Sequence, residues 1–122
     1  MTEKRLARPK KARDTGFHDY VLNDLLGGRS GITSRAMFGG WGLYHDGMIF
    51  AIIVGGELYV KADGKGKQAF KAAGSRPFTY TNRVRRKPVE MPYWLVSEDV
   101  MEDADTFEGW VAHALLAAKA NR

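Results

Sequence analysis

Few residues of this chain have the type and spacing that enzymatic chemistry requires. There is no cysteine, which excludes thiol catalysis, disulfides and zinc–thiolate sites. The three histidines, His18, His45 and His113, lack the pairwise spacing of metal ligands. No serine occupies a nucleophile elbow, and no pair of carboxylates is placed for general acid–base catalysis. We therefore expect a protein that is not an enzyme and that uses no metal ion and no small-molecule cofactor.

Two basic segments have the chemistry to contact a polyanion. Residues 1–13 hold six basic side chains against Glu3 alone, which accounts for the whole net charge of +5. A loop over residues 83–87 holds the other dense cluster. Such clusters contact phosphates without sequence preference, so a nucleic acid is a candidate partner; a disordered tail and a solvated hairpin tip explain the same residues. The candidate contacts are Lys4, Arg5, Arg8, Lys10, Lys11, Arg13, Arg83, Arg85, Arg86 and Lys87.

Other candidate sites have competing interpretations. The run Gly64-Lys65-Gly66-Lys67 could hold a phosphate at a helix start, whereas Asp63 as a plain N-cap explains the same residues. An arginine beside an apolar strand, such as Arg35, usually has a buried carboxylate or an external anion as its partner. Residues Arg35–Gly42 could form a ligand-binding loop, but their glycines are interpreted as structural, allowing a bend or a close approach. The acidic stretch Glu98–Glu108 is interpreted as the solvated entry to a helix.

Hydrophobic patterns predict the elements that would position these residues. In order, they are a helix over 14–26, strands over 41–45, 48–54 and 57–62, a helix over 65–73, strands over 77–81 and 89–96, and a helix over 106–119. The order α-β-β-β-α-β-β-α predicts an α+β fold of two layers, with an antiparallel sheet of about five strands packed against helices. We expect one domain over residues 14–122, preceded by a disordered basic arm over residues 1–13.

The turn dipeptides Asp46-Gly47 and Gly55-Gly56 also predict the strand register, because two-residue hairpins fix it. The expected pairs are His45 with Met48, Leu43 with Phe50, Trp41 with Ile52 and Val54 with Glu57. One face then carries Trp41, Leu43, Phe50, Ile52, Tyr59 and Lys61. The other face carries Gly40, Gly42, Tyr44, Ile49, Ala51, Ile53, Leu58 and Val60, and we assign it to the core. The first face, with the aromatic residues Trp41, Phe50 and Tyr59, is expected to be covered by a protein partner, most simply a second copy in a dimer.

The segment SRAMFGGWGLYHDGMIFA, followed by LYVKAD and RPFTY, resembles the N-terminal domain of the TfoX/Sxy family of competence regulators. The shared motif is an arginine followed by Met-Phe-Gly-Gly, then Gly-Leu-Tyr, then Leu-Tyr-hydrophobic-Lys. The motif residues here are Arg35, Met37, Phe38, Gly39, Gly40, Gly42, Leu43, Tyr44, Gly47, Phe50, Leu58, Tyr59 and Lys61. Later matches are Phe70, Gly74, Pro77, Phe78, Tyr80, Tyr93 and Trp110.

The resemblance implies a bacterial, cytoplasmic regulatory module that acts by protein–protein contact in DNA-uptake competence or transcription regulation. It also implies the same order of elements that the pattern predicts. Competence regulators carry a second, C-terminal domain, so we expect a stand-alone first domain whose activity can differ from theirs. Weak, sequence-tolerant nucleic-acid binding is the alternative function. No membrane span is expected, because the apolar run Met48–Val54 is far shorter than the roughly 20 residues needed.

Overall fold

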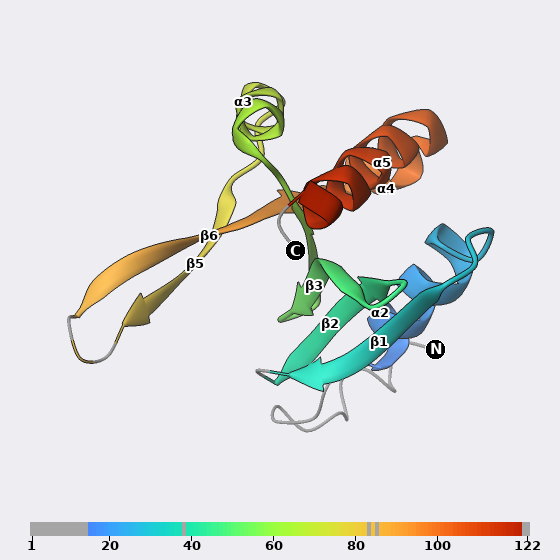
Figure 1. The fold of residues 1–122 in the computed structure, drawn as a ribbon, viewed down its shortest axis with the longest axis horizontal. Coiled ribbons are helices and arrows are strands. Elements are labelled where there is room, and N and C mark those ends of the chain that lie inside the picture. Colours follow the sequence, from blue (N-terminus) through green and yellow to red (C-terminus); the bar gives the residue numbers. More distant parts are fainter. Residues whose placement is uncertain (1–14, 38, 83, 85, 121–122) are drawn as a thin grey trace.

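The computed structural model describes residues 15–37, 39–82, 84 and 86–120 as an antiparallel sheet with helices against one face (Figure 1). The elements are α2 (Thr15–Asp19), η1 (Tyr20–Leu25), β1 (Ile32–Met37), β2 (Gly40–His45), β3 (Met48–Val54), β4 (Glu57–Lys61), α3 (Gly64–Ala72), β5 (Pro77–Asn82), β6 (Lys87–Val96), α4 (Glu98–Glu102) and α5 (Ala104–Ala120). The strand order is β1-β2-β3-β4-β6-β5. The predicted α+β class is confirmed. The predicted basic arm, residues 1–13, lies outside the described residues.

The sheet has six strands where about five were predicted. The additional strand is β1, which forms an edge and pairs only with β2. Half of its sequence, ITSRAM, is polar and none of its residues is fully buried, so it lacks the apolar pattern of the other strands. The short helix α4 was likewise not expected; it begins at Ser97, whose hydroxyl accepts a hydrogen bond of 3.2 Å from the Val100 amide.

Both predicted hairpin turns are present. Asp46 and Gly47 have φ angles of 50° and 86°, and Gly55 and Gly56 have φ angles of 61° and 77°. Two successive residues with positive φ are the requirement of a type I′ hairpin, and glycine adopts this conformation without strain. The turns set the pairs that were expected next to them, His45 with Met48 and Val54 with Glu57.

The register between β2 and β3 then changes at a β-bulge. Tyr44 pairs with Ile49, but Leu43 pairs with Ala51, so Phe50 is an extra residue in β3. Phe50 and the adjacent Ala51 therefore both lie in the core beneath the helices. The predicted pairs of Leu43 with Phe50 and Trp41 with Ile52 are wrong, because they assumed unbroken alternation.

The predicted grouping of Trp41, Phe50 and Tyr59 on one exposed face is consequently wrong. Phe50 is 1 % exposed and Trp41 packs against the core, with its ring 4.1 Å from that of His18. Tyr59 lies in the second cluster, on the opposite face, and is 6 % exposed. The bulge has moved Trp41, Leu43 and Phe50 to the helix side of the sheet.

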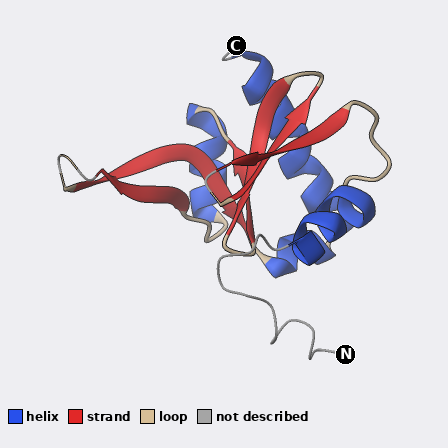
Figure 2. Cartoon of the chain, turned by 90° about the horizontal axis from the view of Figure 1, so that it is seen from below, coloured by secondary structure: helices blue, strands red, loops and turns tan. Residues whose placement is uncertain are grey.

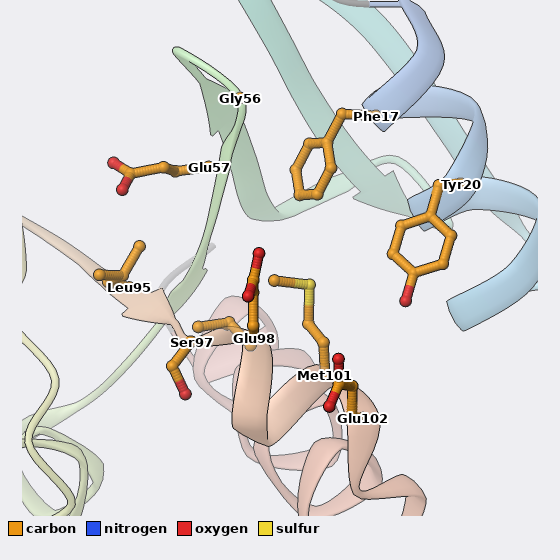
Figure 3. Close-up of a pocket in the computed structure, with 10 residues that line it drawn as sticks. Phe17, Tyr20, Gly56, Glu57, Leu95, Ser97, Glu98, Met101 and Glu102 are labelled. Atoms are coloured by element: carbon orange, nitrogen blue, oxygen red, sulfur yellow. The ribbon is translucent and has the colours of Figure 1, made fainter. Parts of the chain in front are cut away.

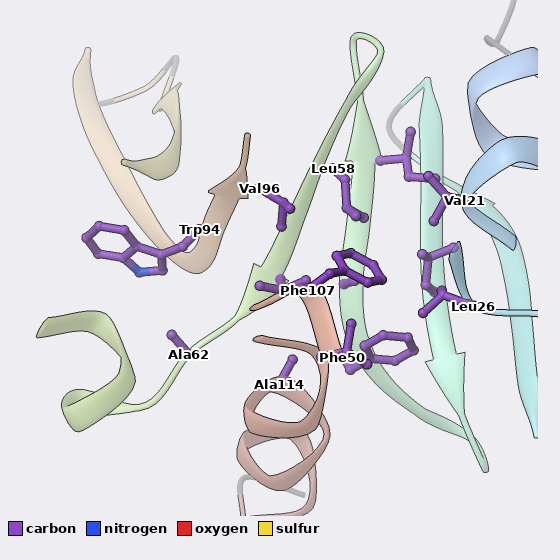
Figure 4. Close-up of a cluster of buried hydrophobic side chains, with 14 of the residues drawn as sticks. Val21, Leu26, Phe50, Leu58, Ala62, Trp94, Val96, Phe107 and Ala114 are labelled. Atoms are coloured by element: carbon purple, nitrogen blue, oxygen red, sulfur yellow. The ribbon is translucent and has the colours of Figure 1, made fainter. Parts of the chain in front are cut away.

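The main core lies between the sheet and the helices (Figure 4). Helix α5 crosses β3 and β4 and contributes Phe107, Val111, Ala114 and Ala118. α2 continues directly into η1, and we call the two together the first helix of the described residues. The first helix contributes Val21 to the core, and Leu26 follows it. On the opposite face a second cluster consists of strand residues alone: Ile49, Ile52, Val54, Tyr59, Phe78, Met91, Tyr93 and Leu95. No helix of the described residues contributes to this cluster, and we call this side of the sheet the helix-free face.

Helix α3 is fixed to α5 by close packing. The Asp63 side chain accepts a hydrogen bond of 2.8 Å from the Gly66 amide, so the N-cap interpretation of this segment is confirmed. That hydrogen bond lowers the pKa of Asp63. Phe70 stacks on Trp110 at 4.1 Å, and the ring of His113 lies directly over Gly66. Glycine at position 66 therefore permits the contact between the two helices.

Gly66→Ala is expected to lower the free energy of unfolding by about 1–3 kcal/mol, because the added methyl group would overlap His113. Gly64→Ala is the matched control, since a methyl group there has open space, and it should be neutral or slightly stabilising. Adding His113→Ala should remove most of the extra cost of Gly66→Ala. Urea denaturation measures these differences, and equal stability of the two glycine variants would contradict the α3–α5 contact.

Gly40→Ala should destabilise the domain more than Gly42→Ala. A methyl group at Gly40 would collide with the backbone carbonyl of Ile53, which cannot move without disturbing the sheet. At Gly42 the methyl group would meet only side-chain atoms, including the ends of Met37 and Ile49. We expect a loss on the order of 1–3 kcal/mol at Gly40 and a smaller loss at Gly42, measured by chemical denaturation. The reverse order would show that strand approach is not what requires Gly40.

Candidate functional site

A cleft of about 560 Å³ opens between the first helix, the β3–β4 turn, the end of β6 and α4 (Figure 3). Its apolar wall includes Phe17, Tyr20 and Met101. Tyr20 is the first residue of η1, and a π-helical turn is often found at functional sites. The cleft therefore joins segments that are about 80 residues apart in the sequence.

Three carboxylates line this cleft: Glu57, Glu98 and Glu102. Glu98 and Glu102 are four residues apart on α4, so they share one side of the helix. Both are exposed, and neither forms an ion pair with another described residue. We call the site the acidic cleft. Aromatic rings, a methionine and unpaired carboxylates together suit a cationic group with an apolar stem, such as an arginine or lysine side chain.

Glu57 is held at the border between the acidic cleft and the helix-free face. It accepts a hydrogen bond of 2.8 Å from the Tyr59 hydroxyl, and its carboxylate lies 3.6 Å from the Arg76 guanidinium. Burial and the hydrogen bond to Glu57 raise the pKa of Tyr59 to about 12. Phe78 contacts the Tyr59 ring edge-on at 5.2 Å. Glu57 is therefore already engaged, whereas Glu98 and Glu102 remain available to a ligand.

The polar residues of the family motif meet on the helix-free face. The Arg35 guanidinium carbon lies 5.8 Å from the Tyr44 ring centroid, and the Lys61 ammonium lies 6.0 Å from the Tyr93 ring centroid. Both are within the range of cation–π attraction. We call these four residues, Arg35, Tyr44, Lys61 and Tyr93, the cationic face. They come from four different strands, β1, β2, β4 and β6.

Neither cation of this face has a carboxylate partner among the described residues. The buried carboxylate that was one expectation for Arg35 is therefore not found in this part of the chain, and Arg35 is exposed. Burial raises the pKa of Tyr93, and the nearby Tyr44 raises it further. The Tyr93 hydroxyl is thus a neutral hydrogen-bond donor at physiological pH.

The remaining motif residues are structural where they are described. Leu43 and Leu58 are in the main core, and Met37 lies against Gly42 on the helix-free face. Gly39 and Gly47 both have positive φ at hairpin turns. Phe38 lies outside the described residues. The glycines therefore shape the hairpins, in line with their structural interpretation.

The predicted basic contacts are only partly described. Arg86 and Lys87 are exposed at the end of the β5–β6 hairpin, which reaches away from the helices (Figure 2). Arg83, Arg85 and the arm residues lie outside the described residues. The histidines are dispersed, and no three His, Asp or Glu side chains among the described residues gather as metal ligands. None of the described helices has the length and apolarity to cross a membrane.

Sequence reasoning missed the acidic cleft, because Glu98 and Glu102 were interpreted as a solvated helix entry. Their spacing of four residues is a signal that they share one helix side. The wall formed by Phe17 and Tyr20 has no such signal, since their helical periodicity also fits plain core packing.

Tyr59 gives a direct test of the border region. Its protonated hydroxyl stabilises the fold below pH 10, its ordinary pKa, and this contribution is lost as the pH rises toward about 12. Ultraviolet titration of tyrosinate should therefore show a late step. Tyr93 also contributes to it, because its pKa is raised as well, so Tyr59→Phe should reduce the amplitude of this step. Tyr80→Phe, at an exposed tyrosine, should leave that step unchanged. A late step of unchanged amplitude in Tyr59→Phe would contradict the buried, hydrogen-bonded position of the Tyr59 hydroxyl.

Comparison with known proteins bears on these sites. The sequence model of the TfoX N-terminal domain matches residues 24–118. This range contains the whole cationic face and the three carboxylates of the acidic cleft, whereas Phe17 and Tyr20 precede it. No curated protein matches the chain. Because the match covers most of the chain, including all six strands, the protein belongs to the TfoX N-terminal domain family.

Proposed function

We propose that this protein is a non-enzymatic interaction module that binds a basic segment of a partner protein in the acidic cleft. The observation that carries the proposal is the pair Glu98 and Glu102, unpaired among the described residues at a cleft of about 560 Å³. Carboxylates of this kind steer a cationic partner and set its orientation. Phe17 and Tyr20 supply apolar contact for the stem of the bound side chain.

Membership of the TfoX N-terminal domain family supports a regulatory role for this contact. We propose that this contact acts in DNA-uptake competence or in transcription regulation, and that it takes place in the bacterial cytoplasm. The partner is a protein with an exposed arginine or lysine segment; a second copy of the chain is the simplest alternative occupant. Each copy has its own basic side chains, so self-association would appear as concentration-dependent sedimentation.

Direct nucleic-acid binding is the second candidate function. It is favoured by the exposed Arg86 and Lys87 on a projecting hairpin, together with the basic residues of the arm. From Asp14 onward, however, basic and acidic side chains balance, so the domain provides little general attraction for phosphates. We therefore rank this function below the protein contact.

The cleft is tested with a fluorescent peptide of alternating arginine and glycine, titrated with the full chain and followed by anisotropy. Glu98→Gln with Glu102→Gln should weaken binding about tenfold, or about 1.4 kcal/mol. The matched control is Asp99→Asn with Asp105→Asn, which removes the same charge from acidic residues that do not line the cleft. Equal weakening by both pairs would mean that the peptide responds to general charge alone, and the proposal would fail.

DNA binding is tested by salt titration of the full chain and of a variant without residues 1–13. We expect negligible affinity at physiological salt and retention of the peptide contact after the deletion, since the cleft lies wholly within the described domain. Strong DNA binding that is lost on the deletion and weakened by Arg86→Gln would favour the second function. Thermal unfolding of the shortened chain serves as the folding control.

A further inference from the structure

We propose that the cationic face is a second binding site, which takes an acidic segment of a protein partner through two separated carboxylates. This site is distinct from the acidic cleft in position and in sign of charge. One carboxylate would pair with Arg35 and the other with Lys61. The contact does not depend on the acidic cleft being used, so the two sites can be tested independently.

The charges of the face are arranged for an anionic ligand. Arg35 and Lys61 have no ion-pair partner among the described residues, and each lies over a tyrosine ring. The rings restrict the cations without neutralising them, since a cation–π contact leaves N–H donors free to bind an anion. The hydroxyl groups of Tyr44 and Tyr93 add further hydrogen-bonding capacity.

The strand order keeps the two cations apart. The backbones of β1, which carries Arg35, and β4, which carries Lys61, lie three strand intervals of about 4.8 Å apart, or roughly 14 Å across the sheet. Arg35 contacts Tyr44 of the adjacent β2, whereas Lys61 contacts Tyr93 on β6, which lies on the side of β4 away from β1. The two charges are therefore suited to two separate anions, not to the convergent grip of a single small anion.

An extended peptide has the matching spacing. Its residues rise by about 3.3 Å each, so side chains four positions apart lie about 13 Å apart on the same side. Between Arg35 and Lys61 the face is apolar. Ile49 and Ile52 of β3 lie there and belong to the second cluster, on the helix-free face. We therefore infer a segment with two acidic residues at positions i and i+4 and an apolar residue between them.

The same observations favour a protein over a nucleic acid. Tyr93 is 8 % exposed, and Tyr44 is half-buried with Arg35 over its ring, so neither ring offers an open surface for base stacking. Apolar residues between the cations also suit side chains better than a sugar–phosphate chain. Nucleic acid is nonetheless the natural competitor, and it is included in the test.

The position of Arg35 depends on Gly42. A methyl group at Gly42 would meet Met37, Ile49 and the ring of Tyr44. The absence of a side chain lets the Tyr44 ring lie close to the sheet, where Arg35 covers it. This gives a structural reason for a glycine at this position of β2, the strand that pairs with β1 on one side and with β3 on the other.

The test uses a fluorescent heptapeptide, Gly-Glu-Gly-Val-Gly-Glu-Gly, and the full chain. Arg35→Gln and Lys61→Gln should each weaken its binding about tenfold, because each removes one charge-assisted contact. The matched control is Lys71→Gln, at an exposed lysine in the last turn of α3. Glu98→Gln with Glu102→Gln should not weaken this peptide, which separates failure at this site from failure of the acidic cleft. Amide NMR spectra verify that each variant is folded.

Three results would overturn the proposal. If Lys71→Gln weakens heptapeptide binding as much as Arg35→Gln and Lys61→Gln do, the peptide responds only to the general charge of the protein. Equal affinity for a peptide whose two glutamates are adjacent would refute the separated carboxylates. The third result is that a single-stranded oligonucleotide of the same charge displaces the heptapeptide and binds more tightly than it does, as followed by the NMR signals of the Arg35 and Lys61 amides. This result would assign the face to nucleic acid instead.

Discussion

The extra residue Phe50 in β3 determines which side chains meet the helices. Along a regular strand, Phe50 and Ala51 would point to opposite faces, yet both are almost fully buried in the main core. Because β2 is paired across this bulge, Trp41 and Leu43 reach the helix side, while Gly42 and Tyr44 reach the helix-free face. The bulge thus completes the core and at the same time brings Tyr44 to the side of the sheet on which Lys61 and Tyr93 lie.

Two surfaces of opposite charge follow from this arrangement. The acidic cleft uses α4 and the first helix, whereas the cationic face uses strands alone, and Glu57 lies at their border. The hydrogen bond from Tyr59 and the ion pair with Arg76 engage Glu57, which keeps its charge from neutralising the cationic face. A partner that presents the wrong sign to either surface would be repelled, so adjacent surfaces of opposite sign select for orientation as well as for affinity.

Much of the fold could be predicted because several short segments determine their own backbone conformation. Asp46-Gly47 and Gly55-Gly56 require positive φ, and Asp63 caps α3, so the hairpins and the helix start were visible in the sequence. The bulge was not visible, since Phe50 and Ala51 are both apolar and fit either register. Edge strand β1 was missed, because half of its residues are polar and its apolar residues do not alternate regularly. The acidic cleft and the cationic face unite distant residues through tertiary packing, and the predicted register had placed Tyr44 and Lys61 on opposite faces of the sheet.

The most direct test of this account is the position of the Phe50 ring, measured by nuclear Overhauser effects in the folded protein. The bulge places Phe50 in the core with α5, so we expect cross-peaks between its ring protons and methyl groups of that helix, including Ala114 (Figure 4). Cross-peaks from Phe50 to Ile52 and Tyr59, with none to α5, would show that the side chains of β3 alternate between the two faces of the sheet without a break. That result would contradict the bulge, and with it the separation of the core from the cationic face.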